Sequence, residues 1–265
     1  MADRDLSDSA VLVARTLSDD TGSIEIDDLV VCEVPVALSF NGISYAVMMA
    51  SPADLEDFIR GFAIGEGIVS TPSAIYDIEI THTANGVDVN ASVSNETAYK
   101  LKDRRRSMAG PSGCGLCGIE SIEQLSREIK PVTSDGSNIQ VVPSEAALNQ
   151  ALAGLRPLQA ISRQTGGAHA AAWCSPAGEI LALREDVGRH NALDKILGWR
   201  ALNPGEGFVL VSSRASFEMV SKAATAGVPV LVAVSAPTSA AIDTAKRAGL
   251  CLIAFATEGR SARYS

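Results

Sequence analysis

The amino-acid sequence predicts an α/β protein in which a small N-terminal α+β domain is followed by a layered α/β domain. In the first hundred residues, the turn signals Asn41-Gly42 and Asn85-Gly86 each join two apolar runs, which indicates two hairpins. Beyond residue 200, short apolar strands alternate with helices, and this order implies parallel strands joined by right-handed crossovers. The chain has 265 residues, 46% of them hydrophobic, so it can bury a sizeable core.

Residues 1–27 are predicted to form a flexible acidic tail. The segment is rich in Asp and Glu, and it lacks the basic start and apolar stretch of a signal peptide. It accounts for much of the formal net charge of −9, and an acidic chain is not typical of a general nucleic-acid binder. The apolar runs are far shorter than the roughly 18 residues of a membrane span. We therefore expect a cytoplasmic protein that binds neither nucleic acid nor membranes.

Residues 28–112 are expected to form the N-terminal α+β domain. Its predicted strands cover 29–40, 43–50, 76–82 and 87–93. A helix over 53–67 is expected after Ser51 and Pro52, because serine suits the N-cap and proline suits the first helical position. Small and turn-forming residues dominate 110–116, which predicts an exposed loop at the end of this domain.

Residues 113–265 are expected to form the layered α/β domain. Its predicted helices cover 119–129, 144–154, 191–202, 217–226 and 238–248. Its predicted strands cover 168–174, 179–183, 208–211, 228–234 and 250–255. The first helix after the polar connector 130–138 is expected to begin at Ser144 and to end at Gly154.

Three predicted strands of this domain end in segments that could hold a phosphate-bearing ligand. Ligands of open α/β sheets bind beyond the carboxyl ends of the strands, and helix N-termini favour anions. The segments offer hydroxyls, small residues and two arginines, although ordinary caps and turns have the same composition. They are Ser212-Ser213-Arg214, Ser235-Ala236-Pro237-Thr238 and Ala256-Thr257-Glu258-Gly259-Arg260.

Two histidines are further candidates. His169 follows a Gly-Gly turn, and His190 lies beside Arg189 in the charge-rich strand-to-helix junction 184–195. Either histidine could face a pocket, or could be structural. The crowding of charged side chains at the junction favours His190 as the site residue.

The five cysteines divide into two groups. Cys32, Cys174 and Cys251 lie in apolar, strand-like runs, where a free cysteine acts as a small hydrophobic residue. Cys114 and Cys117 instead form a Cys-x-x-Cys pair in a glycine-rich loop, after the basic run 104–106.

The Cys-x-x-Cys pair permits a thiol–disulfide centre, part of a zinc site, or a sulfur carrier with one activated thiolate. The basic run would stabilise such a thiolate. Two chance cysteines in a loop are the remaining alternative. Hydrolytic nucleobase deamination is excluded, because that chemistry needs His-x-Glu before the cysteines, and His169 follows them with Ala171 two residues on.

Several of these segments together resemble the formate dehydrogenase accessory sulfurtransferase family. The resemblance extends from about residue 28 to the C-terminus, and the block 184–195 is its most specific part. The segments that carry it are 48–50, 54–58, 65–68, 112–118, 163–169, 184–195 and 235–238.

The resemblance implies a sulfur carrier, or sulfurtransferase, that takes persulfide sulfur from a cysteine desulfurase. The sulfur passes to the molybdenum cofactor carrying two pterin–guanine dinucleotides, for insertion into the catalytic subunit of formate dehydrogenase. Cys114 would carry the persulfide and Cys117 would assist. A C-terminal domain with a cytidine-deaminase-like fold and a homodimer are also implied, and no permanently bound metal is expected.

The resemblance assigns cofactor binding to the segment Phe255, Ala256, Thr257, Glu258, Gly259 and Arg260. The strand ends add Ser212, Ser213, Arg214, Ser235 and Thr238 as expected cofactor-binding residues, and the two histidine segments add His169, Arg189 and His190. Family members commonly have glycine where this chain has Ser213, and often a basic residue near Thr257. The alternatives are a non-catalytic, cofactor-binding chaperone for formate dehydrogenase and a zinc-stabilised structural protein.

Overall fold

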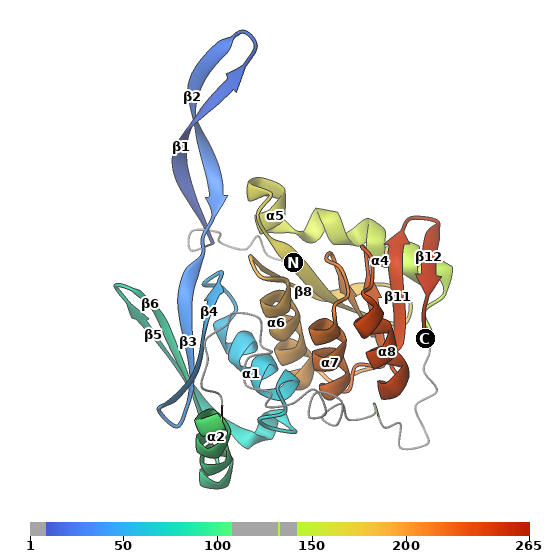
Figure 1. Cartoon of the computed structure of the whole chain (residues 1–265). Coiled ribbons are helices and arrows are strands. Elements are labelled where there is room, and N and C mark those ends of the chain that lie inside the picture. Colours follow the sequence, from blue (N-terminus) through green and yellow to red (C-terminus); the bar gives the residue numbers. More distant parts are fainter. Residues whose placement is uncertain (1–8, 108–131, 133–141) are drawn as a thin grey trace.

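The computed structural model in Figure 1 describes residues 9–107, 132 and 142–265. These residues form a two-stranded hairpin, a four-stranded sheet and a six-stranded sheet. Cys114, Cys117, the predicted helix 119–129 and the predicted domain boundary at residue 112 all lie outside the described residues. Within the described part of the chain, no helix is long and apolar enough to cross a membrane.

The N-terminal domain is built on a mixed sheet of order β4-β3-β6-β5, in which β3 pairs with β6 in parallel. Helix α1 packs on one face of this sheet, where alternating residues of β3 and β6 are buried. The elements are β3 (Val34–Phe40), β4 (Ile43–Ala50), α1 (Leu55–Gly65), the 3-10 helix η1 (Pro72–Ala74), β5 (Ile75–Thr83), β6 (Gly86–Val93) and α2 (Asn95–Ser107). The two predicted hairpins of this domain are therefore present.

The C-terminal domain is a six-stranded sheet of order β12-β11-β10-β9-β7-β8, in which β9, β10 and β11 are parallel as predicted. Its strands are β7 (His169–Cys174), β8 (Ile180–Asp186), β9 (Phe208–Val211), β10 (Val230–Ala233), β11 (Cys251–Thr257) and β12 (Arg260–Arg263). Its helices are α4 (Glu145–Leu158), α5 (Ala160–Thr165), α6 (Arg189–Leu202), α7 (Phe217–Thr225) and α8 (Ser239–Ala248).

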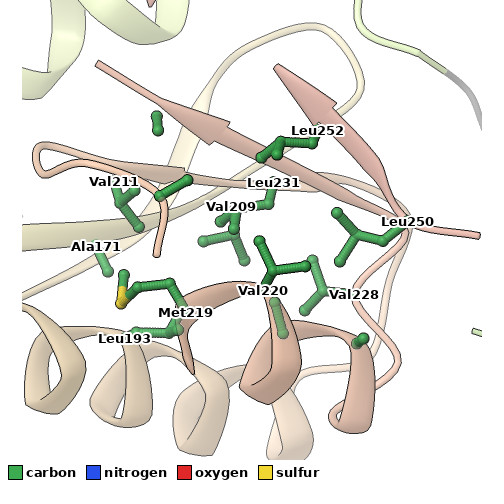
Figure 2. Close-up of a cluster of buried hydrophobic side chains, with 14 of the residues drawn as sticks. Ala171, Leu193, Val209, Val211, Met219, Val220, Val228, Leu231, Leu250 and Leu252 are labelled. Atoms are coloured by element: carbon green, nitrogen blue, oxygen red, sulfur yellow. The ribbon is translucent and has the colours of Figure 1, made fainter. Parts of the chain in front are cut away.

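Both faces of the six-stranded sheet are covered, which explains why its central strands are apolar throughout. Figure 2 shows Val209, Leu231 and Leu252 pointing from the sheet toward Leu193 and Met219 of α6 and α7. The alternate residues of the same strands pack against α4 on the opposite face. The core therefore consists of two layers of aliphatic side chains.

The N-terminal segment differs from the predicted flexible tail. Residues of this segment form β1 (Ala10–Asp19) and β2 (Gly22–Val31), an antiparallel hairpin. β1 contains the apolar run 10–14, and β2 contains Ile24, Ile26 and the apolar run 29–31, but the prediction gave more weight to the acidic residues between them. The predicted strand 29–40 is also divided, because β2 ends before Cys32 and β3 begins after Glu33.

Several helix boundaries differ from the prediction by two residues or more, and contacts with other elements explain two of them. Helix α1 begins at Leu55, after Asp54 in a left-handed conformation, and Ser51 makes contacts with the other domain instead of capping the helix. Helix α4 begins after Ser144, whose Oγ accepts the N–H of Ala147, but it continues past Gly154 to Leu158. Gly154 is tolerated because the side chain of Ile180 fills the space beside it.

The buried cysteines have the role that the sequence predicts. Cys174 and Cys251 lie in β7 and β11 and are almost fully buried. Burial raises the pKa of Cys174 to about 12, which makes it a poor nucleophile. Cys32 is half-buried and lies between β2 and β3.

The two domains are joined by a close crossing of α1 and α6. A Cβ at Gly61 would overlap the backbone oxygen of Asp194, and a Cβ at Gly198 would overlap the backbone oxygen of Asp57. Each helix thus presents a glycine to the backbone of the other, so the helices approach more closely than larger residues would permit.

A buried ionic cluster lies at the same junction. Lys222 Nζ lies 2.9 Å from Asp194 Oδ2 and 2.8 Å from Glu66 Oε1 of the N-terminal domain. Burial raises the pKa of Asp194 to about 6, although the Lys222 charge acts in the opposite direction. The carboxyl group of Asp194 therefore titrates well above the range of an exposed aspartate.

This shift predicts a specific pH dependence of stability. The folded state binds the Asp194 proton more tightly than the unfolded state, so the resulting stabilisation is complete below about pH 3.8 and is lost as the pH rises through about 6. Relative to Asp194→Asn, the wild type is expected to gain unfolding free energy as the pH falls from neutral to about 4. Urea titrations at several pH values measure this difference, with Asp243→Asn on the exposed side of α8 as the control. A difference that does not change with pH would contradict the prediction.

Candidate functional site

The carboxyl ends of four strands meet at one edge of the six-stranded sheet. β8 is antiparallel to β7, which is antiparallel to β9, so β8 has the same direction as β9, β10 and β11. A pocket of about 440 Å³ lies at this edge, between the strand ends and helices α4 and α5. It is lined by Leu152, Leu155, Arg156, Gln159, Ser162, Ala168, His169, Ser212, Val234, Ala256, Thr257 and Glu258.

Five of the predicted site residues line this pocket, and they come from three strand ends that are distant in the sequence. They are His169, Ser212, Ala256, Thr257 and Glu258. The position of Ser212 is fixed by β7, because its Oγ accepts the N–H of Ala170 at 2.8 Å and its own N–H donates to the Ala170 carbonyl. The side of the pocket formed by the sheet therefore consists of residues held by backbone hydrogen bonds.

The opposite wall of the pocket consists of residues that the sequence did not predict as site residues. Arg156, Gln159 and Ser162 reach the pocket from the end of α4 and the start of α5. The carboxylate of Glu185 in β8 accepts the N–H groups of Ile161 and Ser162 at 2.9 and 2.8 Å, which anchors the first turn of α5 to the sheet. Nothing in the sequence near Arg156 pairs it with a strand end a hundred residues away.

The β11–β12 turn is held in place by α4. Asn149 Oδ1 accepts the N–H of Gly259 at 2.8 Å, so Thr257 and Glu258 are positioned at the pocket. Arg260 is exposed and does not line the pocket. Gly259 has a φ of +74°, which a residue with a side chain would adopt only with strain.

Phe255 is in an unusual conformation directly before this segment. Its φ is +50°, in the left-handed region that a bulky residue rarely adopts, and a register shift interrupts the β11–β12 pairing between Ala254 and Thr257. Its N–H donates to the carbonyl of Ser235, which ties β11 to the end of β10. Phe255 is 42% exposed, so the strained backbone presents an aromatic residue at the surface.

The two candidate histidines have different surroundings. His169 lines the pocket, and burial, followed by the charge of Arg189, lowers the pKa of its imidazole, while Asp186 acts in the opposite direction. The ring is therefore neutral at neutral pH and can both donate and accept a hydrogen bond. His190 does not line the pocket, and its Nε2 lies 2.9 Å from Glu218 Oε2.

The other predicted residues do not line the pocket. Ser213 is buried and its Oγ donates to the carbonyl of Arg214, whose own side chain is exposed. Thr238 caps α8, because its Oγ1 accepts the N–H of Ala241 at 3.2 Å. Arg189 is the first residue of α6, and Ser235 is exposed at the end of β10.

A buried network fixes the β8–α6 junction against the N-terminal domain. Lys195 is fully buried, and its Nζ donates to Asp186 Oδ2 at 2.6 Å and to the Ser51 carbonyl at 2.9 Å. Asp186 also accepts the N–H groups of Ser51 and Gly188 and the side-chain amide of Asn191. The charged block of the sequence thus serves largely to join the domains next to the pocket.

Comparisons with known proteins agree with this architecture. The model of the FdhD/NarQ family matches residues 31–265. "Sulfur carrier protein FdhD" of Bordetella petrii is 47% identical over 264 residues, covering 98% of this chain and 92% of the relative. The protein of the same name from Chromobacterium violaceum is 49% identical over 231 residues, covering 86% and 85%.

A solved structure has the same fold. The chain described as a formate dehydrogenase accessory protein from Desulfotalea psychrophila matches with a TM-score of 0.76 and 24% identity, covering 97% of both chains. The likeness to a cytidine-deaminase-like fold stays a prediction. The family match covers nearly the whole chain, and the relatives share about half of its residues. The chain therefore belongs to the FdhD/NarQ family.

Proposed function

We propose that this chain is a cytoplasmic sulfur carrier, or sulfurtransferase, required for formate dehydrogenase activity. It would take persulfide sulfur from a cysteine desulfurase and transfer it to the molybdenum cofactor that carries two pterin–guanine dinucleotides. The relatives named sulfur carrier protein FdhD support the carrier role. The observation that carries the cofactor part is the pocket at the strand ends.

The pocket suits one nucleotide end of such a substrate. Its volume of about 440 Å³ lies in the usual range for small-molecule sites. Leu152, Leu155 and Val234 offer an apolar surface for a flat base, and the exposed Arg156 at the rim could pair with a phosphate. Glu258 would accept the N–H donors of a guanine edge, a role in which its negative charge is an advantage.

The sulfur step is assigned to the Cys-x-x-Cys pair, which lies outside the described residues. The Cys114 thiolate would attack the terminal sulfur of the donor's persulfide, forming a new S–S bond while the donor's cysteine leaves as a thiolate. Cys117 would assist the later release of that sulfur to the molybdenum substrate. We also propose that the protein acts as a homodimer.

Mass spectrometry tests the carrier role. After incubation with a cysteine desulfurase and cysteine, the peptide that contains Cys114 and Cys117 is expected to gain about 32 Da, which is one sulfur atom. The gain should disappear on treatment with dithiothreitol, because a persulfide is reducible. Peptides with Cys174 and Cys251 serve as internal controls, since both thiols are buried. An unmodified Cys114–Cys117 peptide would contradict the proposal.

Nucleotide binding tests the pocket. Arg156→Gln is expected to weaken GDP binding by about 10-fold or more, because a charge-assisted hydrogen bond contributes about 1.5–3 kcal/mol. Isothermal titration calorimetry measures the affinity, and Arg247→Gln on the exposed side of α8 is the matched control. If the wild type and Arg156→Gln bind GDP with equal affinity, Arg156 is not part of the site. If the wild type binds GDP and ADP with equal affinity, the pocket does not recognise guanine.

A further inference from the structure

The pocket at the strand ends has a direction, because it crosses four neighbouring strands of the sheet. Glu258 follows β11, Val234 follows β10, Ser212 follows β9, and His169 begins β7. Neighbouring strands lie about 4.8 Å apart, so the three intervals between β11 and β7 separate the two outer residues by roughly 14 Å. This separation is comparable to the length of an extended nucleoside diphosphate. We call the two ends the acidic end, at Glu258, and the histidine end, at His169.

Helices α4 and α5 follow the same direction on the other side of the pocket (Figure 1). Asn149 near the start of α4 lies at the acidic end, because its Oδ1 accepts an N–H of the β11–β12 turn. Ser162 of α5 lies at the histidine end, where its N–H donates to the carboxylate of Glu185 in β8. Arg156 lines the pocket from the last turn of α4. The helix therefore carries this guanidinium away from the acidic end and toward the histidine end.

The charges that line the pocket are distributed unevenly between its ends. Its charged and titratable lining residues are Glu258 at the acidic end and Arg156 and His169 toward the other end. Arg260 belongs to the β11–β12 turn but does not line the pocket. Behind the histidine end, the charge of Arg189 is close enough to lower the pKa of the His169 imidazole. A diphosphate is therefore repelled at the acidic end and attracted at the histidine end.

The two carboxylates of β8 beside His169 are engaged by other groups. Asp186 is opposite His169 in the β7–β8 register, and its carboxylate accepts Lys195 Nζ at 2.6 Å. Both carboxylate oxygens of Glu185 accept N–H groups of α5. Burial and Arg189 therefore keep the imidazole neutral, and Asp186 opposes them only weakly. The charged and titratable groups around the ring are Asp186 and Glu185 of β8, Arg189 and His190 of α6, Arg156 of α4 and Arg163 of α5.

We propose that a guanine nucleotide binds with its diphosphate at the histidine end, and that His169 takes up a proton from solvent and binds the diphosphate as an imidazolium. The proposal rests on the nucleotide binding proposed above and adds its direction and its coupling to pH. The proton forms one N–H bond on the ring and comes from the buffer, so no other reactant is needed. A phosphate oxygen beside the ring supplies the negative charge that favours the imidazolium.

The proposal fixes the sign of the pH dependence of binding. The complex holds the His169 proton more tightly than the free protein does, so GDP affinity falls as the pH rises. The fall is at most about 10-fold per pH unit, because one proton is coupled to each nucleotide. A terminal phosphate itself titrates near pH 6, so the useful range is about pH 7 to 8.5. The difference between the wild type and His169→Gln removes any remaining contribution of the phosphate.

Isothermal titration calorimetry in buffers with different ionisation enthalpies counts the protons. The wild type is expected to take up about 0.5 to 1 proton per GDP near pH 7, and His169→Gln close to none. His169→Gln should also weaken GDP binding at this pH by about 10-fold, because a charge-assisted hydrogen bond is lost. His82→Gln, in the exposed part of β5, is the matched control and should keep both the affinity and the proton uptake.

Guanosine, which has no phosphate, tests the direction. His169→Gln is expected to leave guanosine affinity unchanged while it weakens GDP binding. Glu258→Gln is expected to weaken guanosine and GDP by a similar factor and to leave the proton uptake unchanged, because it lies at the end assigned to the base. Equal weakening of guanosine and GDP by His169→Gln would overturn the direction.

Nuclear magnetic resonance tests the protonation on the wild-type protein itself. The chain has three histidines, so His82→Gln and His190→Gln identify the signal of His169 by elimination. Addition of GDP near pH 7 should move the His169 Cε1–H signal to the position of an imidazolium. A signal that stays neutral, or a proton uptake that persists in His169→Gln, would overturn the proposal while nucleotide binding stands. A wild type that binds no GDP would instead end the proposed nucleotide site and this inference together.

Discussion

Replacing Cys114 with alanine is expected to abolish formate dehydrogenase activity in cells that depend on this protein. The side chain would be the attacking thiolate, and alanine has no sulfur with which to form the S–S bond. The purified variant should also show no desulfurase-dependent gain of about 32 Da. Both readouts are needed, because the activity reports the whole pathway and the mass reports the first transfer.

Cys32→Ala is the matched control for this experiment. Cys32 is a half-buried free thiol between β2 and β3, so its loss tests the removal of a partly accessible cysteine elsewhere in the chain. The control should keep both activity and persulfide formation. Full formate dehydrogenase activity in Cys114→Ala would instead favour a cofactor-binding chaperone, for which changes in the pocket would matter and the cysteine would not.

The second large effect is a loss of stability when Lys195 is replaced by methionine. Lys195→Met would leave the carboxylate of Asp186 buried without its cation, and breaking a buried pair in this way costs about 3–5 kcal/mol. The hydrogen bonds that Asp186 accepts from Ser51, Gly188 and Asn191 would remain, but they do not supply a positive charge. The free energy of unfolding from urea titrations measures the loss.

Lys246→Met is the control for this loss. Lys246 is exposed in the last turn of α8, so the same substitution there is expected to change the free energy of unfolding by about 0.5 kcal/mol or less. A loss below about 1 kcal/mol for Lys195→Met would show that Asp186 is stabilised by its N–H donors alone. The Lys195–Asp186 ion pair would then not be needed to hold the β8–α6 junction.

The sequence predicted the C-terminal sheet well because its strands are short, apolar and separated by well-marked helices. β9 has the predicted bounds, and the parallel pairing of β9, β10 and β11 follows from the strand–helix order. The start of α4 was also predictable, because the Ser144 cap depends only on local residues. Apolar strands and helix caps are predictable because they depend on residues that are close together in the sequence.

The elements that were missed depend on distant parts of the chain. The start of α1 is shifted because Ser51 contacts Asp186 and Lys195, and no local rule includes those partners. Half of the pocket was missed for the same reason, since Arg156 reaches it from a helix with no motif of its own. The hairpin β1–β2 was missed because its acidic residues were given more weight than its apolar runs at 10–14 and 29–31.

The close crossing of α1 and α6 has a consequence for the order in which the protein can fold during synthesis. The surface of α1 around Gly61 packs directly on the backbone of α6. Helix α6 is synthesised only after the N-terminal domain has left the ribosome. The nascent first domain can form its own sheet, yet one side of α1 stays uncovered until most of the second domain has been translated. During this interval the nascent chain therefore exposes the side of α1 that later packs on α6. This exposed surface is available to chaperones that bind apolar segments.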